Sequence, residues 1–511
     1  SSLVLQYHLD AIAVSPVPSL TKVVRDLLRL IWLRCLSVYD REKLKMKEFR
    51  CQIQLLLGAL FALSFLFSGL FAEDRILTAH KVAKIRTVTG AEISPDGKLV
   101  AYTLSVPRKP GDGEDGVAWV ELHLVEMESR KSRPFVTGEV NVGSIDWVTA
   151  KRMISFVAKR GDDEFNSLYT IPVDGGEARK VLELESDVLA YSWSPDGDRV
   201  AVIAAEPEKE EVKKLKEQGF SQEIYEEDWR RRRVYVVEPF ESADPPKALE
   251  LDSNAFAVEW SPIDDRLALV LAPTPLIDDS YMHKRVSVVD ASSGRVLAHL
   301  KNPGKLGQVK WSPGGKSLAM ISGADLHDPS EGRLLVGSSS GGELRDLIPD
   351  HPGQVGAIAW KSDDAITIVN EEGVKTSLET VNISTGERVI ETDPQGPAIN
   401  SLSQTDNGNN VACVASTPSH PNEVFFWNRG DRSLTRLTDS NPWLKDVRLA
   451  PQEVVSFKAR DGLDLEGLLI RPLDEVQGQR YPLILTVHGG PESHHKNGWL
   501  TSYSNPGQMA A

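Results

Sequence analysis

The chain alternates short apolar runs with polar turns from about residue 90 to residue 450. A turn of the Ser-Pro-Asp-Gly type precedes each apolar run, and in most copies a Trp stands just before the turn. The intervals between copies are mostly about 42 to 54 residues, and one is about 67. Clear copies begin at Ile93, Trp193, Trp260 and Trp311, weaker copies at Trp147 and Trp360, and a degenerate seventh copy at Ser403.

Each copy predicts a β-hairpin. In the turn, Pro presets φ at the second position and Gly accepts the conformation that closes it. The apolar run alternates as a half-buried strand does, and the Trp supplies a large apolar anchor. A second series of short strands, from "VELHLVEMES" to "EVFFWNRGDR", interleaves with the first. Two hairpins per period make a four-stranded sheet.

Seven copies of a four-stranded unit predict a mainly β fold, a seven-bladed β-propeller over residues 73–450. Each sheet can bury its faces only against its neighbours, so the array must close into a ring. An unrelated all-β array or two β-sandwiches are the alternatives. The longest interval marks an insertion between blades at residues 206–232, where Glu and Lys at helical spacing predict a short exposed helix.

The pattern changes near Gln452. The stretch "EVVSFKARDGLDLEGLLIRP" predicts a strand, an Asp-Gly turn and a second strand. The continuous apolar run from Leu483 to Val487 is typical of a strand covered on both faces. Pro506 in "SNPGQMAA" is placed as in the first turn of a helix. Together with the loop described next and the family resemblance given below, this pattern implies that residues 451–511 are the first strands of an incomplete α/β-hydrolase domain.

The apolar run leads into a His-Gly-Gly-Pro loop. In α/β-hydrolases a loop of this kind, between a strand and a helix, gives a backbone N–H to the oxyanion hole. Glycine lets the tetrahedral oxyanion approach the backbone, and one such donor stabilises the transition state by roughly 3–4 kcal/mol. The candidate oxyanion-hole residues are His488, Gly489 and Gly490. His488 either orients the loop or contacts the oxyanion itself, and we favour the backbone N–H groups of the glycines as donors.

Composition and charge disfavour several classes of function. The formal net charge of −15 disfavours a nucleic-acid partner, which normally requires a basic face. The carboxylates are spread along the chain, as on a soluble acidic surface. The three cysteines offer no disulfide framework and no metal spacing, so the sequence predicts neither a metal nor a cofactor. Cys413 lies in a predicted strand, and we expect a buried, inert thiol.

Residues 46–72 have the layout of an export signal. Lys47 and Arg50 precede a long apolar run, and an acidic pair follows it. The cleavage box is imperfect, so an uncleaved membrane anchor over residues 51–72 is the alternative. Residues 1–45 show no core pattern and are expected to be a non-globular leader or a start assigned too early. The sequence thus predicts export to the periplasm or the cell exterior.

These features together resemble the prolyl oligopeptidase family of serine peptidases. The resemblance rests on the turn-and-strand repeats, on "VSFKARDGLDLEGLLIRP" and on "YPLILTVHGGP", and covers roughly residues 75–511. It is strongest to the exported bacterial branch with acylaminoacyl-peptidases and dipeptidyl aminopeptidases. It implies a propeller that caps an α/β-hydrolase domain and admits peptides but not folded proteins. It also implies a Ser nucleophile in a Gly-x-Ser-x-Gly turn, then an Asp and a His.

The chain departs from the family pattern after the His-Gly-Gly loop. It has no Gly-x-Ser-x-Gly there and ends at Ala511, so we expect a C-terminally truncated member that lacks the whole triad. Ser502 and Ser504 lack the required turn, and His494 and His495 come too early for a triad His. We expect all four to be solvated loop residues. We also expect the apolar run before the loop to have no sheet to join.

Glu226 and Glu227, in "YEEDW", have two interpretations. They form a solvated acidic turn paired with Arg230–Arg233, or they hold the free amino terminus of a peptide substrate. The second role is implied by the resemblance, because dipeptidyl-peptidase relatives use a Glu pair on a propeller insertion. Two carboxylates around one ammonium group would fix the register of cleavage.

The sequence therefore predicts the N-terminal portion of a serine-type peptidase that acts on short peptides and is inactive alone. The alternative is a non-catalytic periplasmic β-propeller binding protein with a vestigial tail. The hairpin and the His-Gly-Gly loop argue against it, because a pure binding propeller has no reason to carry them. A third hypothesis is that the ends of the chain are artefacts of sequencing or gene assignment.

Overall fold

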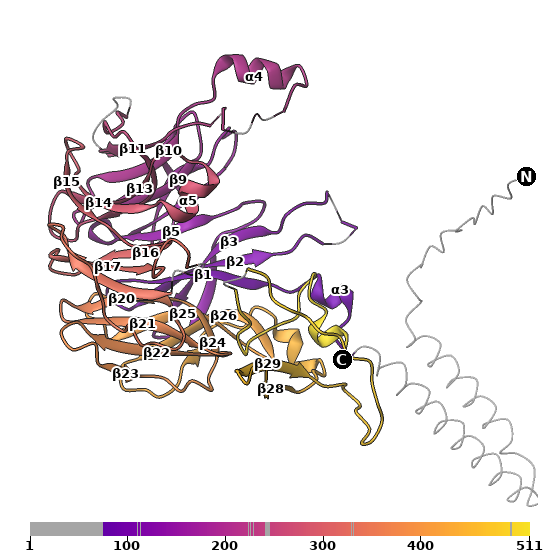
Figure 1. The fold of residues 1–511 in the computed structure, drawn as a ribbon. Coiled ribbons are helices and arrows are strands. Elements are labelled where there is room, and N and C mark those ends of the chain that lie inside the picture. Colours follow the sequence, from indigo (N-terminus) through magenta and orange to yellow (C-terminus); the bar gives the residue numbers. More distant parts are fainter. Residues whose placement is uncertain are drawn as a thin grey trace, which may run out of the picture. The chain divides into compact units, whose positions relative to one another are not determined.

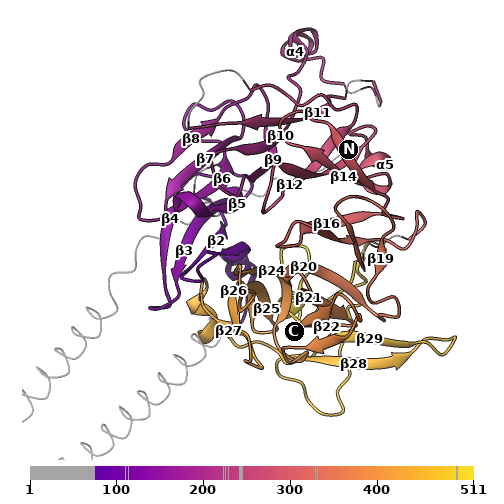
Figure 2. The ribbon, with the colours of Figure 1, turned by 90° about the vertical axis from the view of Figure 1, so that its left-hand side faces the viewer.

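A computed structural model describes residues 75–511, apart from residues 110, 113, 223, 225, 228, 241–245, 329, 331 and 491–492. The predicted leader and the predicted export signal or anchor lie outside the described residues. Seven small antiparallel sheets form a ring, and Figure 2 shows these sheets arranged around its centre. The C-terminal segment lies against one face of the ring (Figure 1). The seven-bladed propeller predicted from the repeats is confirmed.

The strands of each blade follow one another in sequence, from the inner strand to the outer strand. Blades 1 to 3 comprise β1 (Thr87–Ile93), β2 (Leu99–Val106), β3 (Trp119–Glu126), β4 (Lys131–Val136); β5 (Gly143–Val148), β6 (Met153–Ala158), β7 (Ser167–Pro172), β8 (Arg179–Leu182); β9 (Val188–Trp193), β10 (Val200–Ala205), β11 (Arg232–Val237). Blades 4 and 5 comprise β12 (Asn254–Trp260), β13 (Arg266–Ala272), β14 (Arg285–Asp290), β15 (Val296–Leu300); β16 (Leu306–Trp311), β17 (Ser317–Ser322), β18 (Arg333–Ser338), β19 (Arg345–Asp346). Blades 6 and 7 comprise β20 (Gln354–Ser362), β21 (Ala365–Glu372), β22 (Lys375–Asn382), β23 (Arg388–Ile390); β24 (Ala398–Gln404), β25 (Asn410–Thr417), β26 (His420–Asn428), β27 (Thr435–Arg436).

In the part of the chain that the structure describes, the helices are few and short. They are α3 (Ala79–Val82), α4 (Glu210–Glu217), α5 (Ile277–Met282) and the 3₁₀ turns η2 (Thr149–Lys151), η3 (Pro442–Asp446) and η4 (Gly507–Met509). Within the described part of the chain, none is long and apolar enough to cross a membrane.

The turn after the inner strand forms as the sequence predicts. In blade 1 the Ser94 hydroxyl donates to Asp96 Oδ1 at 2.7 Å and accepts from the Leu99 N–H at 2.9 Å. Gly97 has a φ of +71°, in the left-handed region that favours glycine. In blade 3 the hydrogen bonds to Asp196 from the matching Ser hydroxyl and a backbone N–H hold the pKa of that carboxyl below its ordinary value. The repeated phrase is thus a self-contained turn, which explains its visibility in the sequence.

The second strand of each blade is buried on both faces, whereas its alternating pattern predicted burial on one. In β13 every residue from Leu267 to Ala272 is buried, and only Arg266 is partly accessible. The physical reason is that each sheet lies between two neighbours, so the strands in its middle have no solvent face. The prediction of half-buried strands was wrong for this series.

Buried side chains form seven clusters, each between two adjacent blades. Between blades 4 and 5, for example, Val288 packs with Trp311 and Met320. Burying one such side chain stabilises the fold by about 1.5–3 kcal/mol. The tryptophans also bond between blades, because the Trp311 indole donates to Glu259 O at 3.0 Å and the Trp360 indole to Lys310 O at 2.9 Å. At these two junctions the Trp before the turn therefore joins neighbouring blades, whereas the Trp260 indole donates within its own blade, to Asp264 O at 3.2 Å.

The ring closes by packing between blades 1 and 7, because each of these two sheets consists of consecutive strands. Val88 and Val100 pack against Val414 across this junction. The Ile93 N–H donates to Ser403 Oγ at 3.1 Å, which joins the two inner strands. The side-chain amide of Asn441, described next, adds hydrogen bonds between the two ends of the propeller.

Asn441, in the turn after blade 7, joins the chain that enters the ring to the chain that leaves it. Its Oδ1 accepts from the Arg86 N–H at 2.9 Å, and its Nδ2 donates to Arg86 O at 2.7 Å. A parallel bridge between Ile76 and Arg448 continues this contact. One amide therefore satisfies both backbone groups of a residue 355 positions away.

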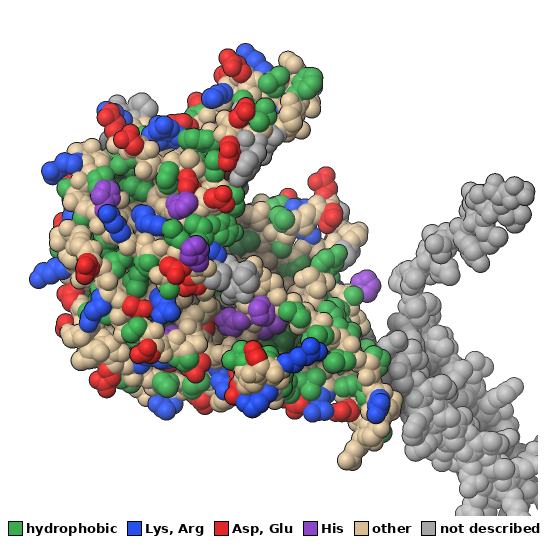
Figure 3. All heavy atoms as spheres, viewed as in Figure 1, with side chains coloured by type: hydrophobic (Ala, Val, Ile, Leu, Met, Phe, Trp, Pro, Cys, Tyr) green, Lys and Arg blue, Asp and Glu red, His purple; other side chains and the backbone are tan. Residues whose placement is uncertain are grey.

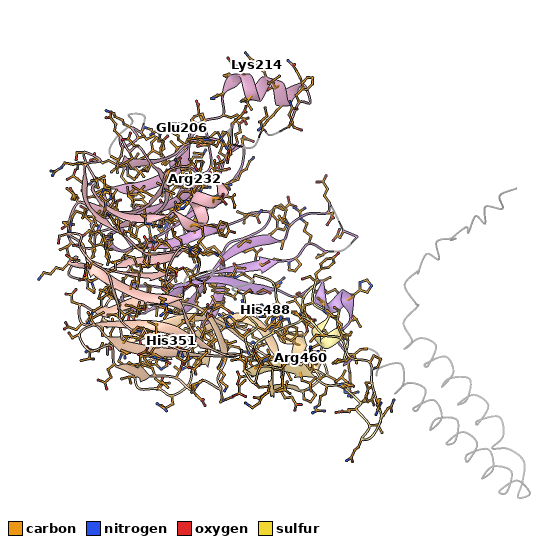
Figure 4. The ribbon with its side chains drawn as sticks, viewed as in Figure 1. Glu206, Lys214, Arg232, His351, Arg460 and His488 are labelled. Carbon is orange, nitrogen blue, oxygen red and sulfur yellow. The ribbon has the colours of Figure 1, made fainter. Side chains whose placement is uncertain are left out.

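The insertion lies within blade 3, between β10 and β11, and not between blades as predicted. Its exposed helix α4 confirms the helix expected from the Glu and Lys spacing. In the described residues, blade 3 has three strands, and a bridge from Tyr235 to Ala248 takes the place of an outer strand. Figure 4 labels Lys214 on the helix, with Glu206 and Arg232 where the insertion leaves and rejoins the sheet.

Candidate functional site

After blade 7 the chain forms the hairpin β28 (Gln452–Lys458) and β29 (Asp464–Ile470), which confirms the predicted strand, turn and strand. Its start is held in place by side-chain amides. Gln508 accepts from the Ala450 N–H at 2.6 Å and donates to Ala450 O at 3.0 Å. Gln452 Nε2 donates to Asn497 Oδ1 at 2.9 Å. Residues near the C-terminus therefore fix the hairpin against the ring.

The run from Leu483 to Val487 is not a strand in the structure. Leu483 and Leu485 are both 80% exposed, as expected for an apolar run without a sheet to join. The hairpin β28–β29 pairs only with itself in the described residues. The predicted helix at the C-terminus is limited to the single 3₁₀ turn η4 after Pro506. The prediction of a buried strand was therefore wrong for this chain, since a buried strand needs neighbours on both edges.

The predicted oxyanion loop, His488 to Gly490, is exposed to solvent. Gly490 has a φ of +136°, which a residue with a side chain rarely adopts. A Cβ on Gly489 would meet nothing within 4 Å, so the space beside its backbone is open. His488 Nδ1 lies 3.1 Å from Gly489 O, within the loop. Among the described residues, the N–H groups of the two glycines have no hydrogen-bond partner.

A cavity of about 1550 Å³ lies beside this loop, between blade 6 and the hairpin. Its wall includes His488, Glu379 and Arg388, together with the exposed run 483–487. Figure 3 shows a patch of histidine on the same side of the molecule, where Figure 4 labels His488. The cavity is larger than the 300–1,000 Å³ that is usual for small-molecule sites. It has room for an extended ligand next to His488.

Glu371, at the end of β21, anchors the segment that follows the loop, and sequence reasoning missed it. The residue is 6% exposed. Lys496 Nζ donates to Glu371 Oε1 at 2.5 Å, and Gln354 Nε2 donates to Glu371 Oε2 at 2.8 Å. Lys496 also donates to Ile399 O at 3.1 Å, and the Asn497 N–H donates to a blade 6 carbonyl. No sequence signal relates two residues 125 positions apart.

The two histidines before Lys496 lie in a loop, as the sequence predicted, but they are half-buried and not fully solvated. His494 Nε2 lies 3.5 Å from Glu371 Oε2, and burial lowers the pKa of His494 below its ordinary value. The His495 ring meets the His488 ring edge to face, with centroids 6.0 Å apart. The reason is the anchoring of this segment to blade 6, which turns both rings toward protein.

The two serines predicted as loop residues are confirmed as such. Ser502 and Ser504 are exposed, and their hydroxyls face each other at 3.4 Å. Neither contacts His494 or His495 in the described structure. They therefore do not form a nucleophile–base pair.

Glu226 and Glu227 are exposed on the insertion, and Glu226 has a φ of +67°. Neither borders the cavity beside His488. Among the described residues, neither forms an ion pair with the following arginines, since Arg233 pairs instead with Glu206 at 2.8 Å. The structure thus leaves the pair solvated, but does not join it to the arginines or to the oxyanion loop.

A second polar cluster lies at the inner edge of the ring, and the sequence interpretation did not identify it. Its members occupy the same place in four copies of the repeat, one residue before the Trp (or Ile93) that stands in front of the turn. They are Glu92, Asp146, Glu259 and Lys310. The Lys310 ammonium bonds to the Glu259 carboxylate. Desolvation inside the ring, together with the neighbouring carboxylates, raises the pKa of the half-buried Glu92 to about 7 and that of Asp146, whose side chain still reaches solvent, to about 6. Their fixed place in the repeat is the signal that could have found them.

Metal and thiol chemistry gain no support from the described residues. In residues 75–511, outside the gaps given above, no group of three or more His, Cys, Asp or Glu side chains could hold a metal ion. Cys413 is fully buried in β25, as predicted, and burial raises the pKa of its thiol well above the ordinary value. It is therefore a core residue.

A seven-bladed propeller that continues into a hairpin and a His-Gly-Gly loop has the architecture of propeller-containing peptidases, and relatives support this class. No protein-family model matches the chain. The chain is 23% identical over 461 residues to "Uncharacterized peptidase YuxL" of Bacillus subtilis, covering 82% of the chain and 67% of that protein. It is 22% identical over 463 residues to "Dipeptidyl-peptidase 5" of Porphyromonas gingivalis, covering 83% and 64%.

Among solved structures, an acylaminoacyl peptidase in complex with Z-Gly-Gly-Phe-chloromethyl ketone shares the fold. Its TM-score is 0.64 at 16% identity, over 84% of this chain and 64% of that chain. The chain thus spans about two thirds of the length of the curated relatives it matches. The sequence relatives named as peptidases and the shared fold support the resemblance to the prolyl oligopeptidase family that the sequence indicated.

Proposed function

We propose that the chain is the N-terminal portion of a serine-type peptidase that hydrolyses short peptides. The observation that carries the proposal is the His-Gly-Gly loop after the propeller, with two glycine N–H groups that have no partner among the described residues. Such donors stabilise the oxyanion of an acyl-transfer intermediate. The relatives named as peptidases support the same chemistry.

In the complete enzyme a serine would attack the peptide carbonyl and form an ester, which water then hydrolyses. This chain would supply the loop donors and a propeller that admits peptides but not folded proteins. It would supply no nucleophile, Asp or His of a triad, and we expect it to be inactive alone. Sequencing the gene past codon 511 tests the proposal: a Gly-x-Ser-x-Gly followed by an Asp and a His supports it, and an in-frame stop without them opposes it.

A substrate role for Glu226 and Glu227 rests on the resemblance and on their exposure on the insertion. In the protein encoded by the whole reading frame, Glu226→Ala should raise KM for dipeptide substrates with a free amino group. N-acylated substrates should be unaffected, because they carry no ammonium group to bind. Equal losses on both kinds of substrate would refute this role.

The second candidate function is a non-catalytic binding propeller. The polar cluster at the inner edge of the ring favours it, since Glu92, Asp146 and Lys310 offer charged groups unrelated to the oxyanion loop. Binding of unfolded peptides without turnover by the product of the whole reading frame would support this candidate over the peptidase.

We also propose that residues 46–72 direct export of the protein. Cell fractionation of the full chain, compared with a chain that begins at residue 73, tests this role. Retention of the shortened chain in the cytoplasm is the expected result, and equal export of both would exclude it.

A further inference from the structure

We propose that Glu371 of blade 6 is a positioning residue that holds the His-Gly-Gly loop in place through Lys496 and the adjacent histidines. The proposal deepens the proposed function, and rests on it for the role of the loop. Glu371 touches neither the loop nor the cavity beside it. Its effect passes through Lys496, which contacts the ring, to the neighbouring His495, which contacts His488 of the loop.

The first link is an ion pair shielded from solvent. The side chains of Glu371 and Lys496 are 5% and 19% exposed, and their charged atoms lie 2.5 Å apart. A buried ammonium group needs an opposite charge, because leaving it unpaired is strongly unfavourable. Gln354 donates to the other carboxylate oxygen at 2.8 Å and so fixes the carboxylate on the blade. Lys496 is therefore bound to a rigid part of the ring.

The second link fixes the backbone around Lys496. The Asn497 N–H donates to Val374 O at 2.7 Å, and the Trp499 N–H donates to Ser416 Oγ at 3.3 Å. A Cβ on Gly498 would collide with Ser416, so the chain passes close to blade 7 at this point. The segment from 494 to 499 is thus attached to blades 6 and 7 by both side chains and backbone.

The third link reaches the loop. The His495 ring packs edge to face on His488, with the ring planes at 83°. Burial lowers the pKa of His494, so its ring is neutral at pH 7 and the ionic partner of Glu371 is Lys496. The run before the loop is solvent-exposed and cannot hold it, since Leu485 and Val487 are 80% and 74% exposed. The anchor on Glu371 is therefore the main restraint on His488 among the described contacts.

Hydrogen–deuterium exchange of the full 511-residue chain tests the proposal. Glu371→Gln should speed exchange of the hydrogen-bonded amides of Asn497 and Trp499 by tenfold or more, and leave the inner strands of the ring unchanged. Glu372→Gln is the matched control, because Glu372 is exposed on the same strand, and it should have no effect. Unchanged exchange of the Asn497 and Trp499 amides in Glu371→Gln would overturn the proposal.

Variants of the partner separate positioning from general damage to blade 6. Lys496→Met should reproduce the faster exchange, and Lys496→Arg should restore protection because it keeps charge and reach. If the amides of Lys496→Arg exchange as fast as those of Lys496→Met, an ionic anchor is excluded. The histidine ring signals give an independent measure: the His488 resonance should shift in Glu371→Gln and stay in Glu372→Gln. None of these readouts needs catalysis, so they stand or fall apart from the peptidase proposal.

Discussion

Replacing Glu92 by Gln should stabilise the protein at alkaline pH and have little effect at acid pH. Glu92 lies on the inner strand of blade 1, with its carboxyl near those of Asp146 and Glu259 and the Lys310 ammonium. Burial is the main cause that raises its pKa from 4.5 to about 7. The charged form is therefore less favourable in the folded protein than in the unfolded chain.

The sign of the effect follows from linkage. Below pH 4.5 the carboxyl is protonated in both states and contributes nothing. As the pH rises toward 7, the unfolded chain loses this proton first, and the folded state is destabilised progressively. Above pH 7 the loss is complete. The rise to about 7 corresponds to about 3.4 kcal/mol at 1.36 kcal/mol for each pKa unit.

The effect of the substitution will be smaller than this figure, because water and the Lys310 charge screen the carboxylate. We expect Glu92→Gln to raise the free energy of unfolding by about 1–2 kcal/mol at pH 8. This corresponds to about 1–2 °C in Tm, for an unfolding entropy of about 2.1 cal/mol/K per residue. Thermal unfolding at pH 5 and at pH 8 measures it, with Glu128→Gln on an exposed turn as the control. A shift of the same size at both pH values, or a lower Tm at pH 8, would refute the reasoning.

Three further predictions concern the ring. Glu379→Gln leaves the Arg388 guanidinium without its fully buried partner and should lower the free energy of unfolding by about 3 kcal/mol or more, measured by urea denaturation; an unchanged midpoint would contradict it. Asn441→Ala removes both bonds to the Arg86 backbone and should cost about 1–3 kcal/mol in the same assay, whereas a loss near zero would show that water replaces the amide. Cys413 should react with a maleimide only after denaturation, and labelling located at Cys413 by peptide mass spectrometry in the folded protein at pH 7 would show that blade 7 opens.

The propeller could be predicted because its signals are local. Ser94, Asp96 and Gly97 complete their turn with hydrogen bonds inside six residues, so each copy stands out without knowledge of the rest. The Trp before the turn was visible for the same reason. The burial of both faces of the second strands could not be predicted, because the pattern of one strand contains no information about the neighbouring blades that cover it.

The candidate site could be predicted only in part. The His-Gly-Gly loop could be predicted because its local sequence is the motif that donates backbone N–H groups to an oxyanion. In the structure Gly490 has a positive φ, which favours glycine. Glu371 and Lys496 meet through the closed ring, so their contact depends on tertiary structure alone. The run from Leu483 to Val487 has the composition of a buried strand, but strand formation depends on partners that its sequence does not contain. Local composition therefore indicated that the segment can form a buried strand, whereas in this chain the segment is exposed and is not a strand.

The most direct test of the account compares two proteins on chromogenic peptides. The purified 511-residue chain and the product of the whole reading frame would be assayed for release of p-nitroaniline from dipeptidyl and N-acyl-aminoacyl substrates. The account predicts turnover by the longer product, loss of that turnover when its Gly-x-Ser-x-Gly serine is replaced by Ala, and none by the 511-residue chain. Turnover by the 511-residue chain, or an inert longer product, would contradict it.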